Sequence, residues 1–385
     1  MSTFLQDRKI SGKIRLNYQR NKNQDQTENI DLAAKAFKYE DCRDEFWNPE
    51  EFSLLWGTSL WEQASESQRI LLNQLYWVAY YSQIISAEIA TIFFNQTSAA
   101  GLYAIEDFRT ICDMLDLESS QERAHIAAFQ KVAREVEDEV FGERLFSYPM
   151  RSPYAETMTF PDTNAVKRFW KWIQLNTFGL LSSGNAFIAS QYFGIRGIRT
   201  LNGKIVQHQL SQYYMNHEDQ ENAPIPSKIS YYHFLDESYH FNSSTIVSHD
   251  VIKHLKAPTA FEKKVANLAI RGCQQDHYNF SVLVNGIFWF DPAAYQTIYK
   301  LFRSPAFGMD DADAREMIRK CCTEDSQGLQ ASYKTHRTAV ESYRAYVSDL
   351  DYVSEDNKSM SLMAKNDISK YLKTANAKFL RFQPL

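Results

Sequence analysis

The chain has 385 residues, enough for one large helical domain or two smaller ones with a substantial buried core. Its net charge of -5, with both signs mixed along the chain, provides no basic surface of the kind that binds nucleic acid. The five cysteines form an odd set without a Cys-x-x-Cys pair, which argues against a disulfide framework or a zinc ribbon and favours a reducing compartment. The first residues lack the basic-then-apolar order of a secretory signal, so we expect a cytoplasmic protein.

The first 40 residues are polar and rich in Asn, Gln and Lys, a composition that predicts an irregular or partly ordered lead-in. The first strong helix is expected after Ser65, because Ser65 and Gln68 have the spacing of a capping box. This helix contains the most apolar run of the chain, residues 70–94, which is long enough to span a membrane. Asn, Gln and Glu side chains interrupt the run, and a bilayer interior tolerates them poorly. We therefore predict a buried bundle helix and no membrane span.

The rest of the chain is helical in pattern and has no strand-turn-strand signals, which predicts an all-α protein. Helices are expected at 101–116, at 118–141 with Ser119 or Ser120 as cap, from about 163 to 214, from a cap at Ser227, and across 260–385 with breaks near Gly286 and Pro305; loops are expected at 148–153 and 217–226. This pattern divides the chain into a lead-in at 1–40, a helical bundle domain at 41–260 and C-terminal helices packed on the bundle at 261–385.

Two Glu-x-x-His elements are the candidate metal-binding motifs of the sequence. The first runs from Glu122 to His125 and the second from Glu237 to His240. Residues three apart share a helix face, so each element offers a carboxylate and an imidazole to one point. In four-helix proteins that bind two metal ions, two helices each supply one Glu and the other two each supply Glu-x-x-His. The two elements therefore predict a two-metal site.

Three further residues extend this pattern. Glu88 lies in the apolar run, where an ionised side chain is costly unless it is paired or bound to metal. His233 is one helical turn before Glu237, on the same face, and Asp236 is placed to orient an imidazole from behind. Either Glu-x-x-His element alone is as consistent with a surface ion pair as with a metal site. The occurrence of both elements together with Glu88 and His233 favours a metal site. The predicted ligands are Glu88, Glu122, His125, His233, Glu237 and His240.

This set of residues resembles the AurF-type p-aminobenzoate N-oxygenases, which are ferritin-like di-iron enzymes with an extra histidine one turn before the last Glu-x-x-His. The resemblance covers roughly residues 55–245, and its most specific part is His233-x-x-x-Glu237-x-x-His240. It implies a ferritin-like four-helix bundle core with additional N- and C-terminal helices, and the six residues above as ligands of two iron ions. Manganese remains an alternative, since the same oxygen and nitrogen donors suit both metals.

The chain departs from that family on the helix before His233, where the family places a metal-binding glutamate. No Asp or Glu occurs between Asp162 and Glu218. At the vacated level the sequence offers Gly203 and Gln207, which we take as the candidate halide side of the centre. His208 is a candidate additional ligand there.

Loss of one carboxylate removes a negative charge and opens a coordination position that an external anion can fill. Non-haem iron halogenases of another fold use this device, with a small residue in place of the carboxylate and chloride on the iron. The chain is similar to a branch related to the AurF-type enzymes, the cyanobacterial dimetal-carboxylate halogenases of the cylindrocyclophane type (CylC-like). The resemblance implies O2-dependent chlorination of an unactivated carbon of a fatty acyl chain that an acyl carrier protein delivers. It further implies that the reaction uses a high-valent oxo species and metal-bound chloride.

Several alternatives stay open. If the protein is an AurF-like N-oxygenase or an aliphatic hydroxylase, we expect Gln207 or His208 to fill the vacant position. If it is a non-enzymatic ferritin-like protein, we expect it to bind metal without oxidising a substrate. If it is a helical protein without a metal site, we expect no bound metal. The glycines between 179 and 203 suit a narrow channel for an alkyl chain, and they suit close helix packing equally well. The electron donor and the exact substrate are not encoded in any motif.

Overall fold

The computed structural model describes residues 4–146, 165–276 and 290–384, and these residues are helical with no strand among them. The all-α prediction is therefore confirmed for the described chain. The α-helices are α1 (Arg8–Asn23), α2 (Thr27–Ala36), α3 (Ser59–Gln63), α4 (Glu66–Tyr103), α5 (Arg109–Val140), α7 (Ala165–Ser183), α8 (Ala186–Met215), α9 (Ile225–His249), α10 (Ala260–Asp276), α11 (Tyr295–Arg303), α12 (Asp311–Thr323), α13 (Gln327–Val347), α14 (Glu355–Lys358), α15 (Ser361–Ala364) and α16 (Ile368–Phe379).

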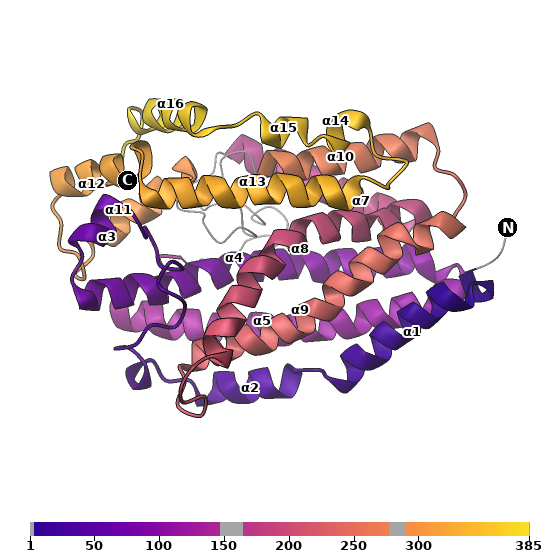
Figure 1. Ribbon diagram of the computed structural model, residues 1–385, viewed down its shortest axis with the longest axis horizontal. Helices are drawn as coiled ribbons and strands as arrows, with labels where there is room; N and C mark the ends of the chain where they lie inside the picture. Colours follow the sequence, from indigo (N-terminus) through magenta and orange to yellow (C-terminus); the bar gives the residue numbers. More distant parts are fainter. Residues whose placement is uncertain (1–3, 147–164, 277–289, 385) are drawn as a thin grey trace.

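Four long helices, α4, α5, α8 and α9, form the centre of the molecule (Figure 1). Helix α4 packs on α5 and α8, and α9 packs on α8 and α5, so the four enclose one common interior. This arrangement is consistent with a ferritin-like bundle. Helices α1 and α2 lie along one edge of the bundle, and α13 to α16 lie along the opposite edge (Figure 1).

Helix α4 begins where the sequence predicts. Ser65 caps it: the backbone amide of Gln68 donates to Ser65 Oγ at 3.3 Å, and the amide of Ser65 donates back to Gln68 Oε1 at 3.0 Å. This reciprocal pair satisfies two amides that a helix start leaves without partners. The apolar run that follows is buried against its neighbours. Across the described chain, no helix combines the length and the apolar character required to cross a bilayer.

Two boundary predictions are wrong. The expected break between 101–116 and 118–141 is absent, because α5 runs unbroken through Ser119. The Ser119 hydroxyl donates to the Leu115 carbonyl one turn back at 2.7 Å, so it acts inside the helix and caps nothing. Similarly, α9 begins at Ile225, and the Ser227 hydroxyl donates to the Trp47 carbonyl at 2.6 Å, so Ser227 does not cap it.

The prediction of an irregular lead-in at 1–40 is also wrong over most of its length. Residues 8–36 form α1 and α2, and Asp7 caps α1 by accepting hydrogen bonds from two backbone amides. Polar residues of these helices are used inside the protein: Asn21, fully buried, donates to Gln121 Oε1 of α5 at 3.1 Å. Composition misleads here because it cannot distinguish a polar side chain that meets water from one that joins two helices.

The expected loop at 148–153 and the break near Gly286 lie outside the described residues. The break near Pro305 is confirmed, since α11 ends at Arg303 and α12 begins at Asp311.

The glycines of α8 serve close packing at two positions. A Cβ at Gly197 would lie 2.0 Å from the hydroxyl of Tyr346 in α13, and one at Gly194 would lie 3.2 Å from the hydroxyl of Tyr352. The Tyr346 hydroxyl is held 2.9 Å from Ser248 Oγ of α9 and has little room to retreat. Small residues therefore allow the C-terminal helices to approach the bundle.

We predict that Gly197→Ala lowers the free energy of unfolding by about 1–3 kcal/mol, because the added methyl group overpacks a rigid contact. Gly12 of α1 is the matched control, since a Cβ there has no neighbour within 4 Å. Gly12→Ala should leave stability unchanged or raise it by up to about 1 kcal/mol. Urea denaturation of both variants measures the difference, and equal effects would contradict the packing argument.

Candidate metal centre

Three helices bring the six predicted ligands together in the bundle interior. Helix α4 supplies Glu88, α5 supplies Glu122 and His125, and α9 supplies the other three. All six side chains are buried. Their ligand atoms form two groups in which every atom lies within 4.8 Å of the others: Glu88, His125, His233 and Glu237 in one, and Glu122, Glu237 and His240 in the second. Glu237 belongs to both groups, as a bridging carboxylate would.

The imidazoles point one ring nitrogen inward, towards the carboxylates. His125 Nδ1 lies 3.3 Å from Glu122 Oε2, and His240 Nδ1 lies 3.0 Å from Glu237 Oε1. His233 Nε2 lies 3.2 Å from Glu88 Oε1. These nitrogens and oxygens therefore face one shared space.

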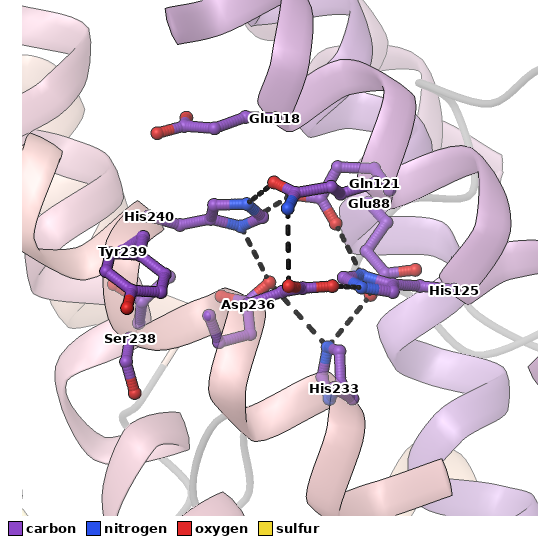
Figure 2. A network of polar contacts seen from close by, with 12 residues as sticks. Glu88, Glu118, Gln121, His125, His233, Asp236, Ser238, Tyr239 and His240 are labelled. Atoms are coloured by element: carbon purple, nitrogen blue, oxygen red, sulfur yellow. Dashed lines mark hydrogen bonds and ion pairs between the residues drawn. The ribbon is translucent and has the colours of Figure 1, made fainter. Parts of the chain in front are cut away.

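The outward ring nitrogens of His125 and His240 are held by partners from other helices (Figure 2). His125 Nε2 lies 3.1 Å from Asp236 Oδ2, and His240 Nε2 lies 3.0 Å from Gln121 Oε1. The Gln121 amide in turn donates to Asp236 Oδ1 at 3.2 Å. With Nε2 turned outward, Nδ1 is directed inward and can bind a metal ion once its proton is lost, the arrangement that a metal-binding histidine requires.

Two of the six side chains lack hydrogen bonds within the described part of the chain. Although His233 Nε2 lies 3.2 Å from Glu88 Oε1, the two groups are not aligned as a hydrogen bond, and their polar atoms make no other hydrogen bond among the described residues. A buried polar group without a hydrogen bond costs about 1–3 kcal/mol. Divalent cations would satisfy these atoms, and oxygen with imidazole donors suits iron or manganese. The residues present therefore fit a pair of such ions.

Electrostatics divides the cluster into neutral and charged members. Burial raises the pKa of Glu88 well above its ordinary value, and His125 offsets only part of that shift. Burial, together with the charge of His125, lowers the pKa of His233 to about 3. Burial would raise the pKa of Glu122 as well, but hydrogen bonds and charge from His125 and His240 lower it to about 2. Metal binding would therefore displace a proton from Glu88.

A buried ion pair lies one helical turn from the cluster. Glu118 of α5 pairs with Arg196 of α8, and both are almost fully buried. Arg196 also donates to Ser244 Oγ at 2.8 Å and to the His240 carbonyl at 3.1 Å. One guanidinium thus ties α8 and α5 to the turn of α9 that carries His240.

A cavity of about 390 Å³ opens onto the cluster between α4, α7, α8, α9 and α10. Its walls are mainly aliphatic and aromatic. The ligands Glu88, Glu122, His233, Glu237 and His240 form part of its lining. An elongated apolar molecule entering this cavity would meet the cluster at its inner end.

Helix α8 presents no carboxylate to the cluster. It turns Thr200, Gly203 and Gln207 towards the cavity, at the three- and four-residue spacing of one helix face. His208 is not brought there: it is exposed, packs against Phe234 with ring centroids 5.4 Å apart and lines a separate surface pocket.

Three residues around the centre are not among those predicted from the sequence: Gln121, Glu118 and Arg196. Gln121 and His125 are one turn apart, as are Glu118 and Glu122, so the face of α5 that carries the ligands also carries both missed residues. That spacing was a usable signal for Gln121 and Glu118. No local pattern marks Arg196, since its partners come from other helices.

We predict that Glu88→Gln stabilises the metal-free protein at pH 7.5 by about 1–3 kcal/mol, because it replaces a buried carboxyl group that disfavours its charged form. Because the pKa of Glu88 is higher in the folded protein than in the unfolded chain, its carboxyl group does not destabilise the fold at pH values below the unfolded pKa. The destabilisation is complete at pH values above the folded pKa. The same change should remove metal. Thermal unfolding and elemental analysis measure the two effects, with the exposed Glu66→Gln in the first turn of α4 as control. Lower stability of the metal-free variant would contradict this account.

We predict that Asp236→Asn weakens metal binding by about 10- to 100-fold, because the His125 imidazole loses the carboxylate that orients it. Asp250→Asn, at the end of the same helix, removes only a surface contact with Lys13 and should bind metal normally. Anaerobic titration with Fe(II) or Mn(II) measures both affinities. Equal affinities would show that Asp236 has no part in positioning the ligand.

Comparison with known proteins agrees with this geometry. The family model described as "Acyl halogenase CylC-like" matches residues 9–383. Searches of the curated proteins and of the solved structures returned no match. The family match spans nearly the whole chain, including the N-terminal helices, the bundle and the C-terminal helices that cover it. The chain therefore belongs to the CylC-like acyl halogenases.

Proposed function

We propose that this protein is a non-haem di-iron, O2-dependent halogenase that chlorinates an unactivated carbon of a fatty acyl chain. The observation that carries the proposal is the coincidence of three features: the acyl halogenase family, a buried carboxylate and histidine cluster, and an apolar cavity that reaches the cluster beside a helix without a carboxylate. The bound iron ions would supply activation of O2 and a coordination position for chloride.

The protein's own residues would prepare this chemistry. Glu237 belongs to both groups of ligand atoms and Glu122 to one, and these carboxylates would hold the ions together with the imidazoles. Asp236 and Gln121 orient the rings of His125 and His240. Apolar side chains of α4 and α7 would hold the acyl chain and exclude water from the reacting carbon. Gly203 of α8 lines the cavity without a side chain of its own.

Reconstitution tests the proposal directly. The protein is loaded anaerobically with Fe(II), supplied with chloride and a decanoyl-loaded acyl carrier protein, and exposed to O2. We expect a product heavier by one chlorine less one hydrogen, detected by mass spectrometry. Only hydroxylated product across several acyl substrates would refute halogenation and favour an aliphatic hydroxylase.

We predict that Gln207→Glu shifts the outcome from chlorination towards hydroxylation. Gln207 is buried and lines the cavity, so the isosteric change adds a carboxylate where α8 has none. A carboxylate there would compete with chloride for the open position, and we expect the chlorinated fraction to fall by at least about tenfold. The exposed Gln209→Glu, two residues further along, is the control.

The oxygenase alternative makes a different prediction for the same residue. If the Gln207 amide itself binds metal, the protein would exclude chloride and hydroxylate its substrate, and Gln207→Ala would then create chlorination where the unmodified protein has none. The ratio of chlorinated to hydroxylated product in the unmodified protein, Gln207→Glu and Gln207→Ala separates the two functions.

A further inference from the structure

Exposed apolar side chains gather on two neighbouring helices beside the cavity. On α7, Phe169, Trp170 and Leu180 are 56%, 63% and 75% exposed. On α10, Phe261 and Leu268 are 57% and 54% exposed. Exposed apolar groups that form a patch mark an interaction surface more often than scattered ones do.

This patch is continuous with the opening of the cavity. Leu268, Gln174 and Thr177 are exposed to solvent and also line the cavity, so they lie at its mouth. The two helices meet there, since a Cβ at Gly272 of α10 would be 3.0 Å from the side-chain nitrogen of Gln174. Trp170, Gln174 and Thr177 follow one face of α7 at helical spacing.

The same two helices are basic in a protein of net charge -5. Among the side chains that the structure describes on α7 and α10, Lys171, Lys263, Lys264 and Arg271 are basic and Glu262 is acidic. Lys263, Lys264 and Arg271 of α10 are exposed. An opening surrounded by positive charge attracts a negatively charged partner and is expected to raise its rate of association.

Apolar and basic side chains alternate along the exposed face of α10. Phe261, Lys264, Leu268 and Arg271 follow one another at spacings of three and four, so they form a single mixed stripe. A helix that lies in a lipid interface separates its apolar and basic residues onto opposite faces. Apolar anchors among charges are instead typical of a protein interface. The pattern therefore favours a protein partner over a lipid surface.

We propose that the α7–α10 surface, defined by Trp170, Gln174, Lys264, Leu268 and Arg271, docks an acidic carrier protein that holds the acyl chain by its polar end. This inference rests on the proposed function, because it takes the substrate to be an acyl chain. An apolar chain inside the cavity leaves its tethered end at the mouth, so the protein that carries the tether sits on this surface. Trp170 and Leu268 provide the apolar contacts, and Lys264 and Arg271 pair with acidic groups.

Binding of a fluorescently labelled, decanoyl-loaded acyl carrier protein tests the proposal, measured by anisotropy with the metal-loaded full chain. The double variant Lys264→Glu with Arg271→Glu should raise Kd by about tenfold or more, since two attractive contacts become repulsive. Added salt should weaken binding to the unmodified protein and have less effect on the variant. Lys373→Glu with Lys378→Glu on α16 reverses the same number of exposed charges elsewhere and should leave Kd unchanged.

The apolar contact has its own variant. Trp170→Ala should weaken carrier binding by about fivefold or more, as expected for an aromatic anchor at an interface. Leu380→Ala removes an exposed apolar side chain from the far end of the chain and should have no effect. Decanoyl pantetheine, which lacks the carrier protein, should bind all variants equally because the cavity is unchanged. Circular dichroism confirms that each variant is folded.

Three results would overturn the proposal: equal carrier binding by the unmodified protein and the α10 variant, binding to phosphatidylserine vesicles in place of the carrier, or binding to neither. The proposed function fails separately. If the variants lose carrier binding but the protein forms no chlorinated product from any substrate, the docking proposal is supported and the halogenase proposal is refuted.

Discussion

Six ionisable side chains share one buried interior, and the cost of keeping them there shapes the surrounding structure. Glu88 and His233 make no hydrogen bonds among the described residues, and burial shifts the pKa of each towards its neutral form. Glu122 and His125 compensate each other as an ion pair. The outer nitrogens of His125 and His240 meet Asp236 and Gln121. The arrangement leaves lone pairs directed at one space, which is what a metal ion needs and what a self-sufficient core avoids.

Support for this cluster extends well beyond the four central helices. Asn21 of α1 is bonded to Gln121, which contacts His240 and Asp236, so a helix from the N-terminal region stabilises the orientation of the ligands. On the other side, the buried pair of Glu118 and Arg196 joins α5 to α8. Removing one member of such a pair is costly, because the remaining charge stays buried. The centre is thus held by a helix of the N-terminal region and by the bundle itself.

The absence of a carboxylate on α8 gives the cluster two different sides. Towards α5 and α9 it meets carboxylates, imidazoles and their hydrogen-bond partners. Towards α8 it meets Thr200, Gly203 and Gln207, which are uncharged, and Arg196 and Arg199 of the same helix also line the cavity. A substrate and an external anion would both approach from this side. The side of the cluster that faces α8 therefore receives no negatively charged side chain from that helix.

Spacing within a helix is a local property, so the sequence by itself determined the all-α class, the start of α4 at Ser65 and the pairing of each Glu with its His. It also determined that no acidic residue stands between Asp162 and Glu218. The folding of residues 8–36 depended on contacts made across the bundle, and within the continuous α5 Ser119 accepts a hydrogen bond from Asn95 of α4. Only the tertiary structure decided which nitrogen of each imidazole faces inward, that Gln207 lines the cavity while His208 does not, and that Gly197 accommodates Tyr346. These outcomes depend on how helices distant in sequence rotate and approach one another, and no local pattern of residues encodes that geometry.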